Sequence, residues 1–468
     1  MVDYSKSNKL FQTLYRNDQY NDDDIDDDDF EDLMNIIGDD DDDLFGIEIN
    51  NKKKIKDRWI HIRQSWCNHV AQLIHERYFQ NEYRMSFNSW NKLHAVLSCK
   101  LKRKQSKSRS LHPVTINIIM ATGMRWLTGI PVNGVRHMFN LSRTEAYRCT
   151  NKFLNAVMTS KDLAINLPKN REEWNDVKLG FAIRSKDGVM NGCCGAIDGL
   201  FVKTIRPKFW EAHNIRAYYS GHYEHYGLNC QGVCDSNLKF LYFGVVSPGS
   251  TNDNISYTYT GSLSESVENL EMGEFLVGDA AYTTTEHLLI PFTGSQRSKP
   301  DNDAFNFYLS QLRIRIEMAF GLLVNKFRIL KKPLEYHMTK NSRIIMTCAR
   351  LHNFIIDNDG SRIQDDDNIG DIDPNNLQKV NGVTLYPSND SPGNMMVYSP
   401  TMIEDDFEAI PGISMTRRFF VDFLRENNYV RPERNIMRNS KVRNMQIVEK
   451  EVNGLTEYVY DQNYFHPV

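Results

Sequence analysis

Three short apolar runs in the middle of the chain each contain one acidic residue, and this pattern constrains the fold more than any other feature. The residues are Asp198 in GCCGAIDGLFV, Asp279 in EFLVGDAAY and Glu317 in FYLSQLRIRIEMAFG. A carboxylate inside a buried segment is strongly unfavourable unless a positive group meets it, and a divalent cation is the usual partner. The pattern therefore predicts a carboxylate centre that binds metal.

Strand and helix signals around these runs predict a mixed α/β domain. CGAIDGLFVKTI is typical of one strand, LNCQGVCD and LKFLYFGVVS of a hairpin, and EFLVGDAAY of a further strand. A segment rich in Ser, Asn and Tyr before EFLVGDAAY is predicted to be helical, and helices are predicted over about 305–330 and 341–357. Three strands, a helix, a strand and a helix follow the order of an RNase H-like domain.

This fold would bring the three carboxylates together. Asp198 in the first strand lies beside Asp279 at the end of its parallel neighbour, and Glu317 reaches across from the long helix. Arg313 lies one turn before Glu317 and is its expected neighbour. Phosphodiester hydrolysis at neutral pH needs an activated water and a group that stabilises the negative charge on the leaving oxygen. Two divalent cations about 4 Å apart supply both. We therefore predict that these carboxylates hold two Mg²⁺ or Mn²⁺ ions, with Asp198 shared between them.

Asp253 in VVSPGSTNDN is a candidate for a fourth acidic member of this site. Its position after the third predicted strand is equally typical of an Asx turn or a helix cap. We favour a role behind the metal ligands or facing DNA, and we keep Asp253 outside the triad.

Charge is strongly segregated along the 468 residues. Residues 1–50 carry 17 acidic and 3 basic side chains, whereas residues 51–356 carry 24 acidic and 42 basic ones. The overall formal charge of −4 hides this basic body, which suits a polyanion such as DNA. The acidic block NDDDIDDDDFEDLMNIIGDDDDD repels itself and cannot bury a core, so we expect it to be disordered.

Cysteine usage and hydropathy indicate the compartment. The eight cysteines include no CxxC pair and no secretory signal precedes them, which favours a reducing intracellular environment. No apolar run approaches the roughly 20 residues that a membrane helix needs. We expect a soluble protein without membrane contact.

The region before the predicted nuclease domain is helical. An apolar helix is predicted through Ile116 to Trp126, followed by IPVNGVRHMF, the break NLS and a helix that opens at Ser142 with Glu145 three residues on. A short helix, a turn and a longer helix are typical of a helix-turn-helix, although a purely structural bundle shows the same pattern. The candidate DNA contacts are Arg143, Arg148 and Lys152 on the longer helix, Lys203 and Arg206 after the first strand, and Arg313 and Lys326 on the long helix.

These signals divide the chain into four segments. Residues 1–50 are predicted to form an acidic disordered tail, and residues 51–165 a helical domain with the helix-turn-helix-like unit. Residues 166–357 are predicted to form the RNase H-like nuclease domain. Residues 358–468 are predicted to be a mostly disordered tail, with one short helix in RRFFVDFLRENNYV.

Several of these motifs together resemble a known family. GAIDG, PGSTND, LVGDAAY, LSQLRIRIEMAFGLL and ARLHNF are similar, in this order, to the catalytic domain of Harbinger-type (PIF/Harbinger) DDE transposases and the nucleases derived from them. The resemblance covers roughly residues 192–356. It implies an RNase H-like fold, the triad Asp198, Asp279 and Glu317, and two-metal strand cleavage at transposon ends. It also implies nuclear action, a Myb-like DNA-binding partner protein and a homo-oligomer.

We therefore interpret the chain as a metal-dependent DNA endonuclease and strand transferase of the transposase type. The alternative in another class is a domesticated, non-catalytic protein that binds DNA or a partner. A third interpretation is a nuclease that acts on generic DNA or RNA. Terminal inverted repeats flanking the coding region would favour the transposase.

Overall fold

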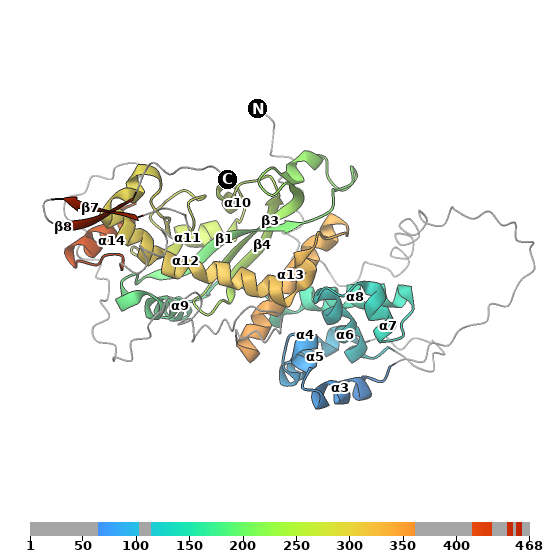
Figure 1. Ribbon diagram of the computed structural model, residues 1–468. Helices are drawn as coiled ribbons and strands as arrows, with labels where there is room; N and C mark the ends of the chain where they lie inside the picture. Colours follow the sequence, from blue (N-terminus) through green and yellow to red (C-terminus); the bar gives the residue numbers. More distant parts are fainter. Residues whose placement is uncertain (1–63, 103–113, 361–413, 433–446, 453–454, 461–468) are drawn as a thin grey trace, which may run out of the picture. The chain divides into compact units, whose positions relative to one another are not determined.

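The computed structural model (Figure 1) describes residues 64–102, 114–360 and 414–432, and the backbone of 447–452 and 455–460. The chain divides into two units at Ile62 and Arg63. The acidic block, the start of the predicted helical region and most of residues 358–468 lie outside the described residues, so the predictions for them stay predictions. Within the described ranges, none of the helices combines the length and the apolar character that a membrane crossing requires.

The described part of the region before residue 165 contains a group of helices. They are α3 (Trp66–His75), α4 (Phe79–Tyr83), α5 (Phe87–Leu101), α6 (Ile116–Leu127), α7 (Val132–Met138) and α8 (Arg143–Thr159). Aromatic rings form their core, with Trp66 stacked on Trp90 at a centroid distance of 5.1 Å. The predicted cap at the start of α8 is present, because the Ser142 hydroxyl accepts a hydrogen bond from the Glu145 amide at 3.2 Å. α7, a turn and α8 thus form the predicted short helix, turn and longer helix.

The sheet has the mixed topology that the strand signals predict. Its strands are β1 (Cys193–Lys203), β2 (Tyr219–Ser220), β3 (His225–Cys234), β4 (Phe240–Pro248), β5 (Phe275–Val277) and β6 (Leu288–Leu289). β3 pairs antiparallel with both β1 and β4, whereas β1 pairs parallel with β5, and β5 with β6. The order β4-β3-β1-β5-β6 is consistent with an RNase H-like domain, and the prediction of a mixed α/β fold is confirmed.

Helices cover the sheet on both faces (Figure 1). These helices are α9 (Arg171–Arg184), α10 (Asp253–Thr258), α11 (Ser262–Glu268), α12 (Pro300–Lys326) and α13 (Met338–Asp359). Cys193 and Cys194 on β1 are both fully buried but belong to different apolar clusters, because successive strand residues point to opposite faces. One cluster contains residues of α12 and α13 such as Phe320, and the other contains Leu263 of α11.

Specific polar contacts join the helical region to α13. The Asp359 carboxylate accepts hydrogen bonds from the amide and hydroxyl of Ser86, at 2.9 and 2.7 Å. Trp126 donates its indole N–H to the Tyr336 hydroxyl at 3.0 Å. Buried apolar residues form one cluster that includes both the helical region and the α12 side of the sheet. The segments predicted over 51–165 and 166–357 therefore share a core.

The helix predicted in RRFFVDFLRENNYV is present as α14 (Met415–Glu426) and packs on the nuclease-like region. Phe420 meets Phe275 of β5 at a centroid distance of 5.2 Å. The Glu286 carboxylate accepts the amides of Met415 and Thr416 at 2.8 and 3.1 Å, which satisfies free N–H groups at the helix start. The remaining elements are η1 (Lys161–Leu163), η2 (Lys186–Gly188), η3 (Ile215–Tyr218), η4 (Gly294–Ser298), η5 (Arg328–Lys331), β7 (Ile447–Val452) and β8 (Leu455–Tyr460).

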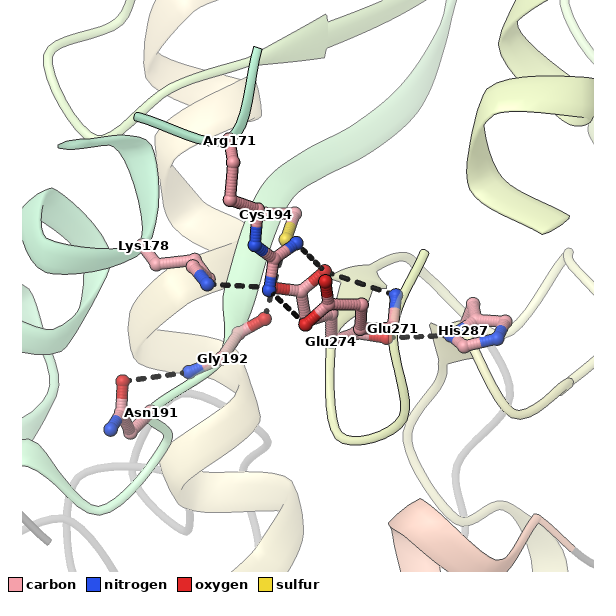
Figure 2. Close-up of polar contacts among 8 residues, drawn as sticks. All are labelled: Arg171, Lys178, Asn191, Gly192, Cys194, Glu271, Glu274 and His287. Carbon is pink, nitrogen blue, oxygen red and sulfur yellow. Dashed lines mark hydrogen bonds and ion pairs between the residues drawn. The ribbon is translucent and has the colours of Figure 1, made fainter. Parts of the chain in front are cut away.

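A buried carboxylate ties α9 to the start of β5. Figure 2 shows Arg171 and Lys178 converging on Glu274. The Glu274 carboxylate forms ion pairs with the Arg171 guanidinium, at N–O distances of 2.6 and 2.8 Å, and with the Lys178 amine at 2.6 Å. Burial alone would raise the pKa of Glu274, but the hydrogen bonds from Arg171 and Lys178 lower it below its ordinary value. Close by, the positive φ of Gly192 and the approach of the Gly273 carbonyl leave no room for a side chain. These contacts fix the start of β5, the strand whose other end is followed by Asp279.

We expect Glu274→Gln to lower the free energy of unfolding by about 3 kcal/mol, since it leaves two cations around a buried neutral amide. The lowered pKa means that this stabilisation is present at neutral pH and is lost as the pH falls through the folded-state pKa of Glu274. Urea unfolding at neutral and acidic pH measures both effects. Glu271→Gln is the control, because Glu271 pairs with the same Arg171 but is exposed and should contribute at most about 1 kcal/mol. Equal losses in the two variants would contradict this assignment.

Candidate active site

Asp198 lies in the middle of β1, half-buried, on the face of the strand that meets α12. Its register partner on β3 is Gly232, and the space above Gly232 holds the ring of Phe320 from α12. The Asp198 carboxylate accepts the amide of Gly199 at 2.8 Å. Burial raises the pKa of Asp198 to about 7, with further increases from the negative charges of Asp279 and Asp253. A charged Asp198 is therefore unfavourable here without a positive partner.

Asp279 follows the end of β5, the parallel neighbour of β1, as the sequence predicts. Its carboxylate accepts the amide of Ala281 at 2.9 Å, which fixes the turn after the strand. Burial is again the main cause that raises the pKa of Asp279, and the negative charges of Asp253 and Glu317 add to it. The charge of Asp279 in turn raises the pKa of Asp198.

Glu317 lies on the exposed edge of α12 and forms an ion pair with Arg313 one turn earlier, at 2.5 Å. The predicted apolar stripe of this helix is buried, with Leu309, Leu312, Ile316, Phe320 and Leu323 all in the core. The charge of Arg313 lowers the pKa of both Asp198 and Asp279, whereas Glu317 raises that of Asp279. The end of β5 and the edge of α12 therefore share one electrostatic environment.

Asp253 approaches β1 from the opposite face. A Cβ on Gly199 would lie 2.0 Å from an Asp253 oxygen, so the glycine makes room for this carboxylate. The same oxygen accepts hydrogen bonds from Asn229 and Gln231 on β3, both at 3.0 Å. The Tyr282 hydroxyl in turn donates to the Gln231 carbonyl at 2.6 Å. Asp253 is therefore held in place by β3, and its charge raises the pKa of both Asp198 and Asp279.

The sequence reasoning missed this amide and tyrosine network. Asn229 and Gln231 are buried, two residues apart, in an otherwise apolar strand. That spacing places them on one face of β3, and a buried amide requires partners. This signal could have identified them, whereas the contribution of Tyr282 depends on how the turn after Asp279 folds.

The carboxylate oxygens of the site are suitable ligands for a hard divalent cation, although the side chains do not form a complete coordination sphere. In the described part of the chain, no three His, Cys, Asp or Glu side chains lie close enough to hold one metal ion. Glu317 instead points to Arg313. Carboxylate oxygens are the ligands that Mg²⁺ and Mn²⁺ prefer, and two of these carboxylates are disfavoured as anions by burial and like charge. Asp198, Asp279 and Glu317 are therefore the residues that could hold such an ion.

Most of the predicted DNA contacts lie at the surface. Arg143 is exposed at the start of α8, whereas Arg148 and Lys152 are partly exposed, and Arg148 pairs with Glu145 at 3.2 Å. Lys203 and Arg206 are exposed at and beyond the end of β1. These positions can reach a phosphate.

The structure contradicts the prediction for Lys326. Its side chain is 3% exposed and points into the core, so the prediction that it contacts DNA is wrong for this structure. The reason is helical periodicity, because Lys326 follows Ile316 and Leu323 on the buried face of α12. Burial lowers the pKa of Lys326 to about 8.

A known protein family matches the region that contains the candidate active site. The family described as DDE superfamily endonuclease matches residues 197–353. These residues, less than half of the chain, are similar to that family. The match begins one residue before Asp198 and includes Asp253, Asp279 and Glu317. The resemblance of this region to Harbinger-type proteins is confirmed by its relatives.

Curated relatives are about a quarter identical to the chain over the aligned residues. "Protein ALP1-like" of Arabidopsis thaliana is 24% identical over 269 residues, which are 54% of this chain and 64% of that protein. "Putative nuclease HARBI1" of Homo sapiens is 25% identical over 287 residues, or 59% of this chain and 78% of that protein. The Rattus norvegicus protein of the same name is 26% identical over 286 residues, with the same coverage. No solved structure matches the chain.

Proposed function

We propose that this protein is a DDE-type endonuclease and strand transferase that cleaves and joins DNA at transposon ends. One observation carries the proposal: the DDE domain brings Asp198, Asp279 and Glu317 from β1, the end of β5 and α12 into one electrostatic environment. Buried carboxylates with raised pKa values are typical of functional sites. Asp198 and Asp279 are two such carboxylates, and Glu317 lies on the exposed edge of α12.

The three carboxylates would hold divalent metal, Mg²⁺ or Mn²⁺, in two positions. Such ions supply a nucleophile at neutral pH and stabilise the charge on the leaving oxygen. The chain contributes the positions of its side chains. β1 and the turn after β5 fix Asp198 and Asp279 through backbone amides. Arg313 holds Glu317 at the helix edge, and a ligand that takes over Glu317 would free the guanidinium to meet a phosphate.

The proposal assigns DNA binding to the basic body of the chain. The α7, turn and α8 unit would act as a helix-turn-helix-like module, with Arg143, Arg148 and Lys152 facing the duplex. Lys203 and Arg206 would contact phosphates beside the active site. We further propose nuclear action as a homo-oligomer, with a Myb-like protein as partner in recognising the transposon ends.

The test is a cleavage assay with DNA that carries the terminal repeats flanking the coding region. We expect strand cleavage with Mg²⁺ or Mn²⁺ and none with EDTA. The binding of the same DNA, measured by fluorescence anisotropy, is followed in parallel. DNA binding without cleavage under any divalent metal would contradict the enzyme and favour the non-catalytic alternative. Equal cleavage of unrelated DNA and RNA would favour a generic nuclease.

A further inference from the structure

The connection between β1 and β3 places a stacked aromatic pair beside the candidate active site. The rings of Phe201 and Tyr223 are 4.3 Å apart between centroids and only 9° from parallel. Phe201 lies on β1, and its ring fills the space above Gly227 and Gly249, where a Cβ would come within 2.4 and 2.6 Å of it. Phe201 is therefore fixed from below. Tyr223 covers it and remains 49% exposed.

Strand register gives the position of this pair relative to the carboxylates. Phe201 pairs with Asn229, and Gly199 pairs with Gln231. Both amides donate to Asp253, which occupies the space above Gly199. Phe201 lies one repeat along the same face of β1, about 7 Å from Gly199. Besides burial, the charges of Asp253, Asp198 and Asp279 raise the pKa of Tyr223, so all three carboxylates lie within its electrostatic reach.

The surroundings of the pair suit a nucleic acid strand. His222 packs its ring against Tyr223 at a centroid distance of 4.7 Å. Lys203 at the end of β1 is exposed, and so are Arg206, Lys208 and Arg216 in the same connection. A rigidly backed and partly exposed aromatic ring on a connection that also carries cations suits stacking on bases, with the nucleic-acid backbone following the positive charges.

We propose that Tyr223, backed by Phe201, stacks on an unpaired base of the DNA strand whose phosphate enters the candidate active site. The inference rests on the proposed function and adds the conformation of the substrate: one nucleotide next to the scissile phosphate is taken out of the duplex stack. Tyr223 acts by positioning the strand and takes no part in the bond changes.

Binding experiments without catalysis test this inference. The full chain is titrated in EDTA with a short single strand that carries a fluorescent adenine analogue, and with the same strand in a duplex. Tyr223→Ala and Tyr223→Leu should weaken single-strand binding by about tenfold or more and abolish the quenching of the analogue, whereas Tyr223→Phe should stay within about twofold of wild type. Tyr223→Leu keeps an apolar group on Phe201, so its effect separates stacking from packing.

Tyr219→Ala is the matched control. Tyr219 is a similarly exposed tyrosine of the same connection that packs edge-on against Tyr226. Its replacement by alanine should leave binding and quenching unchanged. If wild-type protein cleaves DNA but Tyr223→Leu binds and quenches like wild type, this inference is wrong and the proposed function stands. If wild-type protein binds neither DNA form, both fail.

Discussion

Asp198→Asn, Asp279→Asn and Glu317→Gln should each reduce the rate of DNA cleavage at least on the order of a thousandfold. Each change removes an anionic oxygen from the site proposed to hold the metal. A loss of about 4 kcal/mol of transition-state stabilisation corresponds to three powers of ten. Single-turnover cleavage with saturating protein measures the effect. DNA affinity in EDTA should stay within about twofold, since none of these carboxylates is proposed to bind DNA.

Folding and chemistry can be separated in this series. Glu317 is exposed, and its ion pair with Arg313 should contribute at most about 1 kcal/mol to stability. Glu317→Gln should therefore remain folded while losing activity. Glu265→Gln is the control, because Glu265 is an exposed carboxylate on α11 and should leave cleavage unchanged. Cleavage by Glu317→Gln at the wild-type rate would remove Glu317 from the site.

Asp198→Asn should stabilise the metal-free protein at pH 8 by up to about 4 kcal/mol. Burial, Asp279 and Asp253 raise the folded-state pKa of Asp198 to about 7, against an ordinary value of 3.8. The destabilisation of the folded state by ionised Asp198 is absent below the unfolded-state pKa, grows as the pH rises between about 4 and 7, and is complete above 7. A shift of about three units corresponds to roughly 4 kcal/mol. Asparagine carries no charge, so the variant does not have this destabilisation.

Urea unfolding in EDTA at pH 5 and pH 8 measures this effect. The difference in unfolding free energy between Asp198→Asn and wild type should be larger at pH 8 than at pH 5. Mg²⁺ should then stabilise the wild type and leave the variant unchanged, because a ligand that binds only the folded state adds to its stability. A variant that is no more stable than wild type at pH 8 would show that Asp198 is not strained as an anion.

Local patterns in the sequence predicted the parts of the fold that depend on periodicity. β1, the β3–β4 hairpin, α12 and α13 follow from apolar spacing, and the parallel pairing of β1 with β5 places Asp198 near Asp279. The Arg313 and Glu317 pair follows from their spacing of one helical turn. The same periodicity also indicates that Lys326 is buried, so that error came from giving a residue's charge more weight than its position.

Contacts between distant segments could not be predicted in this way. Glu274 meets Arg171 and Lys178 about a hundred residues earlier in the chain, and no local pattern links them. The approach of Asp253 to Gly199 depends on how α10 packs over β1, and the stack of Tyr223 on Phe201 depends on the path of a long connection. Each of these contacts is set by tertiary packing, which overrides local preference.

The central claim is that Asp198, Asp279 and Glu317 bind divalent metal, and anomalous X-ray scattering from crystals grown with Mn²⁺ tests it most directly. We expect Mn²⁺ peaks between these three side chains, with Glu317 turned away from Arg313 to reach them. Crystals of Asp198→Asn should lose those peaks. Wild-type crystals in saturating Mn²⁺ that show no peak there, with Glu317 still paired to Arg313, would contradict the account.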